Sequence, residues 1–73
     1  MASSTYYPNT IVSLTTSSGT EIFNMHSAQV TDVTDKSGGG STLTFSDGST
    51  VDVTESVSDI DGLVTAAGGT VIT

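Results

Sequence analysis

Cysteine is absent from this chain of 73 residues, and positive charge is nearly absent, because Lys36 is the only lysine or arginine. Without cysteine, the chain can form neither a disulfide bond nor a thiolate zinc site. Eight acidic residues give a formal net charge of −7. Nucleic acids and anionic membranes both bind through cationic side chains, so we expect neither of them as a partner.

Long apolar runs are missing as well. The sequence has no stretch of about 18 apolar residues, which a membrane-spanning helix would need, and no basic segment leading into an apolar one, as in a secretory signal. Serine and threonine supply 26 of the 73 residues. A single domain this small buries only about 60% of its unfolded surface, so we expect it to gain stability by association with other proteins.

Residues with catalytic or metal-binding chemistry are few and scattered. His26 is the only histidine, and no serine lies in a G-x-S-x-G motif. Asp59 and Asp61 are two residues apart at the start of an expected helix, where they point in different directions and complement the helix dipole. The segment around them lacks the spaced acids of an EF-hand. We predict no enzyme activity, no catalytic residues, no cofactor and no metal site.

The segment of residues 41–67 carries the clearest structural signals. Leu43, Phe45, Val51 and Val53 alternate with polar residues around Asp47-Gly48, which predicts a β-hairpin with these four side chains on one face. After Thr54 the apolar spacing changes to three or four residues, at Val57, Ile60, Leu63 or Val64, and Ala67. Ser56 has the position of a helix N-cap with Asp59 three residues later, and Gly68-Gly69 ends the helix.

Earlier in the chain, residues 10–16 and 20–25 predict a second hairpin around Ser17-Ser18-Gly19, and residues 30–35 a further strand with a bulge or twist. We therefore predict a mainly β (α+β) fold: a small antiparallel sheet or partly open barrel of about five strands with one short helix at about residues 56–67. The expected organisation is an extended arm at residues 1–9, one domain at residues 10–67, and a strand or arm at residues 68–73.

The two hairpins resemble each other in sequence. Residues 14–22 align with residues 43–51 at a constant offset, which leaves open an internal duplication or a chance similarity in a chain rich in threonine and serine.

Both ends of the chain carry candidate partner-binding residues. Tyr6, Tyr7 and Pro8 lie on the expected N-terminal arm, and Val71 and Ile72 follow the double glycine. Tyrosines on an arm can dock on a neighbouring subunit, and a terminal strand can add to the edge of another sheet. In the alternative, the arm folds back to place one tyrosine on the domain's own core, and the last strand closes the domain's own sheet.

The pattern Asp47-Gly48, Val51, Val53, Glu55-Ser56-Val57 and Asp59-Ile60 resembles that of very small bacterial and phage proteins, including the FlbD-like flagellar operon family. The resemblance implies a small β-rich domain with one helix and no catalytic residues. The chain differs from that family in its tyrosine-bearing start, its near absence of lysine and its last residues. Those features are similar to tailed-phage accessory proteins, which are often short, rich in threonine, serine and glycine, and extended at their termini.

Together these observations predict a virion structural protein that acts by protein–protein contact. It would be a capsid cement or decoration subunit, or a small head or tail component, located in the virion and bound to virion proteins or to copies of itself. Multiple weak contacts would stabilise the assembly by mass action. The alternative is a FlbD-like cytoplasmic adaptor that folds on its own and binds a single protein partner.

Overall fold

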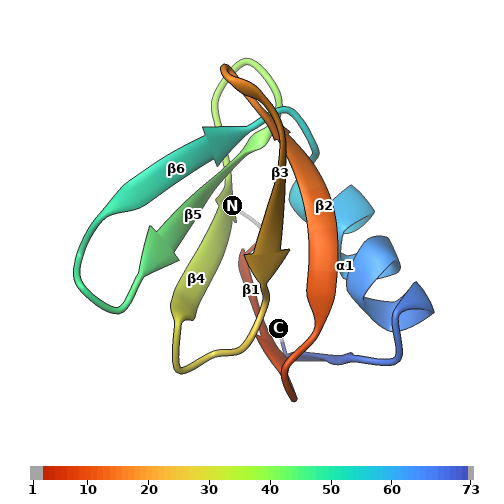
Figure 1. The fold of residues 1–73 in the computed structure, drawn as a ribbon. Helices are drawn as coiled ribbons and strands as arrows, with labels where there is room; N and C mark the ends of the chain where they lie inside the picture. The colour runs from red at the N-terminus through yellow and green to blue at the C-terminus, as the bar shows by residue number, and fades with distance from the viewer. Residues whose placement is uncertain (1–2, 73) are drawn as a thin grey trace.

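The computed structural model describes residues 3–72 and contains seven strands and one helix in that range (Figure 1). The strands are β1 (Ser3–Tyr7), β2 (Ile11–Thr16), β3 (Gly19–Asn24), β4 (Val30–Asp35), β5 (Ser41–Phe45), β6 (Thr50–Val53) and β7 (Thr70–Ile72), and the helix is α1 (Val57–Ala66). Every strand pairs antiparallel with its neighbours.

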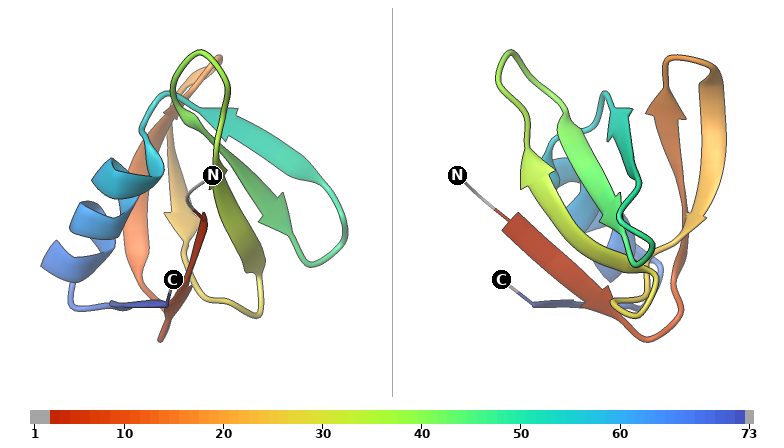
Figure 2. Two further views of the ribbon diagram at one scale, coloured as in Figure 1. Left: turned by 180° about the vertical axis from the view of Figure 1, so that it is seen from behind. Right: turned by 90° about the vertical axis from the view of Figure 1, so that its left-hand side faces the viewer.

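The strands form two layers. One is an open five-stranded sheet in the order β6-β5-β4-β1-β7, and the other is the two-stranded ribbon β2–β3. Figure 2 shows the ribbon lying across from the sheet, with α1 beside it. The predicted mainly β class with one short helix is confirmed. The described residues form an open sheet and a ribbon rather than a closed barrel, and seven strands rather than about five.

The hairpin predicted within residues 41–67 is present as β5 and β6. Leu43 lies opposite Val51, so their side chains share one face of the sheet. Leu43 and Val53 are buried, while Phe45 and Val51 pack partly buried against the same core. The turn is fixed by Asp47, whose Oδ1 accepts hydrogen bonds from the N–H and the hydroxyl of Ser49 at 2.9 and 2.6 Å.

The helix α1 begins and ends where the sequence predicts. Ser56 is the N-cap, and its hydroxyl accepts the N–H of Asp59 at 3.1 Å. At the other end the N–H of Gly68 donates to Thr65 and that of Gly69 to Val64, which is the hydrogen-bond pattern of a Schellman motif. Within residues 3–72, no helix has the length and apolar character needed to cross a membrane.

The ribbon β2–β3 turns through Ser17 and Ser18, and β4 carries the predicted irregularity between Val30 and Asp32. The register of the ribbon differs from that of the β5–β6 hairpin. Leu14 pairs with Glu21, whereas its counterpart Leu43 pairs with Val51, which is the counterpart of Ile22. Leu14 and Leu43 are both buried, so the shift of one residue turns over only the second strand: Ile22 faces outward, whereas its counterpart Val51 packs against the core.

The first described residues differ from the expected arm, whereas residues 70–72 form a strand, one of the two forms expected for residues 68–73. Residues 3–7 form β1 within the sheet, between β4 and β7, and β7 pairs along β1 to close the chain's own sheet. The prediction of an extended arm at residues 1–9 is therefore wrong for residues 3–7, while residues 1, 2 and 73 lie outside the described range. The physical reason is burial, because strand pairing places Tyr6 in the core.

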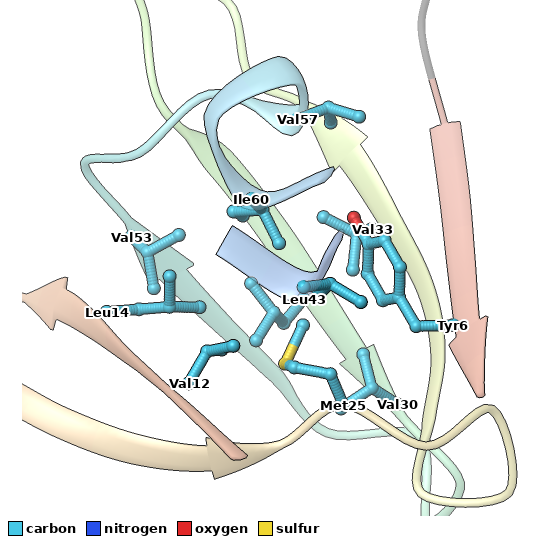
Figure 3. Packing of buried hydrophobic residues seen from close by; sticks show 11 residues of the cluster. Tyr6, Val12, Leu14, Met25, Val30, Val33, Leu43, Val53, Val57 and Ile60 are labelled. Atoms are coloured by element: carbon cyan, nitrogen blue, oxygen red, sulfur yellow. The ribbon is translucent and has the colours of Figure 1, made fainter. Parts of the chain in front are cut away.

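The core lies between the sheet, the ribbon and the helix (Figure 3). Its buried apolar side chains come from every element except β3 and β7: Tyr6, Val12, Leu14, Met25, Val30, Val33, Leu43, Val53, Val57, Ile60 and Val64. Phe23 of β3 and Val71 of β7 pack against this cluster from its margin. The terminal strand β1 thus contributes the largest side chain of the core.

Glu55 connects the ribbon to the sheet. Its carboxylate accepts the N–H of Thr15 at 2.9 and 3.1 Å and the hydroxyl of Thr15 at 3.0 Å, while the N–H of Thr54 donates to the Thr15 carbonyl at 2.9 Å. Partial burial acts to raise the pKa of Glu55. Hydrogen bonds from Thr15, from the backbone of Glu55 itself and from Thr54 together outweigh it, so the net effect is a lowered pKa.

Candidate partner-binding surface

Tyr6 is the one predicted contact residue that the fold removes from the surface. Its side chain is 0% exposed, and its hydroxyl donates to Asp61 Oδ1 on α1 at 2.7 Å. The hydroxyl of Ser4 donates to Asp61 Oδ2 at 3.2 Å. Burial, and next the hydrogen bond to Asp61, raise the pKa of Tyr6 well above its ordinary value. Tyr6 therefore holds β1 to the helix, and its prediction as a partner-binding residue is wrong for this fold.

The other four predicted residues lie around the β1–β7 pair. Tyr7 and Pro8 are exposed at the end of β1, with Tyr7 46% exposed, and Ile72 of β7 is 47% exposed. Val71 is half-buried and packs against the core. Thr5 lies opposite Ile72 and Tyr7 lies opposite Thr70. Because alternate residues share a face, Tyr7 and Ile72 are diagonal neighbours on the side of the sheet away from the core.

This surface, which we call the outer β1–β7 face, comprises Thr5, Tyr7, Thr70 and Ile72. Neither Ser3–Tyr7 nor Thr70–Ile72 contains a charged side chain, although the whole chain carries a net charge of −7. Strand β7 is also an end strand of the five-stranded sheet. The fold thus places two large apolar side chains beside an open sheet edge, an arrangement suited to contact with another protein.

Three further exposed apolar residues were not predicted. Ile22 is 71% exposed and Ile11 59% exposed on the outward side of the ribbon, and Leu63 projects from α1. The sequence contains a signal for the two isoleucines. In Ile11-Val12 and Ile22-Phe23, two adjacent apolar residues occur in a strand, and only one of each pair can face the core. In the described chain Ile11 and Ile22 are the members of these pairs that face outward.

A shallow groove of about 820 Å³ lies between the turn of the ribbon, the glycine-rich turn after β4, and β6. Its charged lining includes Glu21, Lys36 and Asp52. Lys36 Nζ lies 3.4 Å from Asp52 Oδ2, and the Thr42 hydroxyl donates to Asp52 Oδ1 at 2.8 Å. Hydrogen bonding from Thr42 and then from Lys36 lowers the pKa of Asp52. The charged groups that line the groove thus have partners within the fold.

The residues considered for chemistry have structural contacts. The ring Nδ1 of His26 accepts a hydrogen bond from the N–H of Ala28 at 3.0 Å. The backbone carbonyl of His26 accepts one from the N–H of Val30, which closes the turn before β4. Asp59 is exposed in the first turn of α1, whereas Asp61 binds Tyr6 and Ser4 rather than only complementing the helix dipole. Among residues 3–72, no group of three histidine, cysteine or acidic side chains is placed to hold a metal ion.

Comparison of the chain with protein-family models, with curated proteins and with solved structures finds no match. The feature with the clearest physical consequence is the outer β1–β7 face, because it combines exposed apolar side chains, an open backbone edge and a lack of charge.

Proposed function

We propose that this chain is an accessory structural protein of a virion, which stabilises an assembly through protein–protein contacts made by its outer β1–β7 face. It would serve as a capsid cement or decoration subunit, or as a small head or tail component. The observation that carries the proposal is the uncharged open edge at β7, with Tyr7 and Ile72 exposed beside it.

Open sheet edges are usually protected in monomeric proteins by charged side chains, proline or a covering segment, since exposed N–H and C=O groups can pair with another chain. Strand β7 consists of Thr70, Val71 and Ile72 and has no charged or proline residue. A neighbouring protein that pairs with this edge would also cover Ile72 and Tyr7. The burial of apolar area would supply most of the favourable free energy, and the backbone pairing would set the orientation.

The size of the chain fits a role in which contacts are many and individually weak. A folded body with principal extents of 28 × 25 × 24 Å offers little surface for a single large interface. A module that binds only assembled neighbours stabilises the assembly by mass action, and repeated copies add avidity. The net charge of −7 suits an exterior position better than one against packaged nucleic acid.

A second candidate is a cytoplasmic adaptor of the FlbD-like kind that binds one protein partner. The observation in its favour is that both terminal segments, β1 and β7, pair with each other inside the chain's own sheet. A sheet in which β1 and β7 pair with each other needs no strand from a neighbour to pair with β1.

The test uses particles purified from cells that carry the encoding genome. We expect the chain to co-sediment with these particles, and we expect the double variant Tyr7→Lys/Ile72→Lys to be released while remaining folded. Ile11→Lys/Ile22→Lys is the matched control, because it adds the same two charges on two apolar side chains of the ribbon that are more exposed than Tyr7 and Ile72. Retention of the double variant, or absence of the chain from particles together with a one-to-one complex with a single cytoplasmic protein, would contradict the virion proposal.

A further inference from the structure

The chain contains two Asp–Gly pairs, Asp47-Gly48 and Asp61-Gly62, and the fold places them in different surroundings. In such a pair the backbone nitrogen of the glycine can attack the side-chain carboxyl of the aspartate, because glycine has no side chain to shield its nitrogen and its backbone is free to turn. The attack requires the backbone between the two residues to change its dihedral angles. Whether each pair reacts therefore depends on how the fold holds it.

The pair Asp61-Gly62 is held on both sides. The Tyr6 hydroxyl donates to Asp61 Oδ1 at 2.7 Å, and the Ser4 hydroxyl donates to Asp61 Oδ2 at 3.2 Å. Gly62 lies inside α1, where each backbone N–H donates to the carbonyl four residues earlier. Attack by its nitrogen would break the helix at this point and release the carboxylate from β1, so it requires a large part of the fold to open.

The pair Asp47-Gly48 lies in the exposed turn between β5 and β6. Gly48 has a φ of +89° and donates its N–H to the Phe45 carbonyl at 2.9 Å. The Asp47 carboxylate accepts the N–H and the hydroxyl of Ser49 at 2.9 and 2.6 Å. All three hydrogen bonds lie within one turn, so a local opening of the hairpin end breaks them while the core stays packed.

We propose that Asp47-Gly48 is a site of spontaneous covalent modification, at which the folded protein converts aspartate to isoaspartate. The inference goes beyond the proposed function and does not depend on it. The nitrogen of Gly48 forms a bond to Cγ of Asp47, and the hydroxyl of the protonated carboxyl leaves as water with the amide proton. The product is a five-membered succinimide ring.

Water then opens the ring at one of its two carbonyls. Addition at Cγ breaks the new C–N bond and restores aspartate. Addition at the main-chain carbonyl of Asp47 breaks the original peptide bond, so Gly48 stays joined through the former side chain and the residue becomes isoaspartate. One water leaves and one is added, so the mass of the protein is unchanged and no oxidant or reductant is needed.

Ser49 slows this reaction at neutral pH. Its hydroxyl, and next its backbone N–H, donate to the Asp47 carboxylate and lower the pKa of that group. An ionised carboxylate has no hydroxyl that can leave as water, so only the protonated fraction reacts. The rearrangement should therefore be faster in mildly acidic buffer than at neutral pH.

Isoaspartate changes the hairpin end that it forms in. The main chain through the turn becomes longer, and the carboxylate moves from the side chain onto the Cα, away from its place beside Ser49. Phe45 closes this turn by donating its N–H to the Ser49 carbonyl at 2.8 Å, and its ring stacks on Phe23 of the ribbon with the centroids 6.2 Å apart. The modification should therefore loosen the contact between the β5–β6 hairpin and the ribbon.

An endoprotease that cleaves before aspartate, but not before isoaspartate, measures both sites in one digest. A fragment of residues 35–51 reports isoaspartate at position 47, and a fragment of residues 59–73 reports it at position 61. After the folded protein has aged in warm, mildly acidic buffer, we expect at least about tenfold more of the first fragment than of the second. Ageing in guanidinium chloride should give similar amounts of both, because the fold no longer distinguishes the two pairs.

Ser49→Ala should raise the amount of fragment 35–51 several-fold at neutral pH. Ser46→Ala is the matched control, because it removes the hydroxyl on the other side of Asp47 and leaves both hydrogen bonds from Ser49 in place. Equal amounts of the two fragments from folded protein, or fragment 35–51 from unfolded protein alone, would overturn the proposed site. Equal amounts of fragment 35–51 from the two variants would overturn the role of Ser49.

Discussion

The segment of residues 41–67 and the β1–β7 pair are both parts of one fold, yet different interactions determine them. In the first, each element is specified by residues a few positions away: Asp47 and Gly48 form the hairpin turn, and Ser56 caps the helix that follows. In the second, Thr5 pairs with Ile72 at the opposite end of the sequence. Local interactions thus build the middle of the chain, and contacts between its ends complete the sheet.

The two regions also differ in whether their side chains face the core or the surface. The side chains of the segment 41–67 that face inward, such as Leu43 and Ile60, are wholly buried, and its carboxylates at Asp47 and Glu55 bind groups within the fold. The β1–β7 pair has one buried tyrosine facing the core and one exposed tyrosine facing out. Two adjacent residues, Tyr6 and Tyr7, therefore serve stability and contact respectively.

The largest effect is expected from Tyr6→Ala. This variant removes a wholly buried aromatic ring, so it should lower the free energy of unfolding by about 3–5 kcal/mol. That is a large share of the roughly 4–11 kcal/mol expected for a domain of this length. Chemical denaturation followed by circular dichroism measures it.

Tyr7→Ala is the matched control, because the neighbouring side chain is exposed, and it should change stability by no more than about 0.5 kcal/mol. Equal effects of the two substitutions would show that β1 is a detachable arm and would remove the contrast between the two tyrosines.

A smaller effect is expected where β7 joins the helix. A Cβ at Gly69 would lie 2.5 Å from Thr10 Oγ1 and 2.6 Å from Val64 Cγ1, so Gly69→Ala should cost about 1–3 kcal/mol through crowding. Gly62→Ala within α1 meets no atom within 4 Å and should instead stabilise the protein by about 0.5–1 kcal/mol. Thermal unfolding of both variants gives the sign. A neutral Gly69→Ala would mean that Gly69, just before β7, does not pack against Thr10 and Val64.

The smallest effect on stability is expected when the pH is lowered. Because the pKa of Glu55 is lowered in the folded protein, its contribution to stability is present above its unfolded pKa and is lost as the pH falls through the folded value. Unfolding measured from pH 6 down to pH 3 should show this loss, and Glu55→Gln should make the profile flatter. An unchanged profile in Glu55→Gln would mean that the contacts with Thr15 add nothing to the docking of the ribbon.

Much of the fold could be predicted because the signals were local. The hairpin β5–β6, its turn, the helix and both of its caps follow from alternation, a turn dipeptide and capping residues, and the structure confirms them. The pairing of β1 with β7 has no such signal. Residues 3–7 contain one inward-facing large side chain, and their partner strand is at the other end of the chain, so only the folded structure brings them together.

The candidate surface was predicted in part for the same reason. Tyr7 and Ile72 lie on the outer face, but Tyr6 was assigned with Tyr7 because both were placed on an arm. Once residues 3–7 are a strand, alternation requires adjacent side chains to face opposite sides, and only one tyrosine can be exposed. Ile22 was missed because it stands beside Phe23, and alternation alone does not tell which residue of an adjacent apolar pair faces outward.

The central claim is that the ends of the chain pair with each other and leave Val71 on an open edge. Residue-resolved amide hydrogen exchange of the dilute protein tests it most directly. The N–H of Ser27 donates to the Tyr6 carbonyl on the β4 side of β1, so alternation turns the N–H groups of Thr70 and Ile72 toward β1 and that of Val71 away from it. Slow exchange is therefore expected at Thr70 and Ile72, and fast exchange at Val71 between them. Fast exchange at all three residues, or slow exchange at Val71 in the isolated monomer, would contradict it.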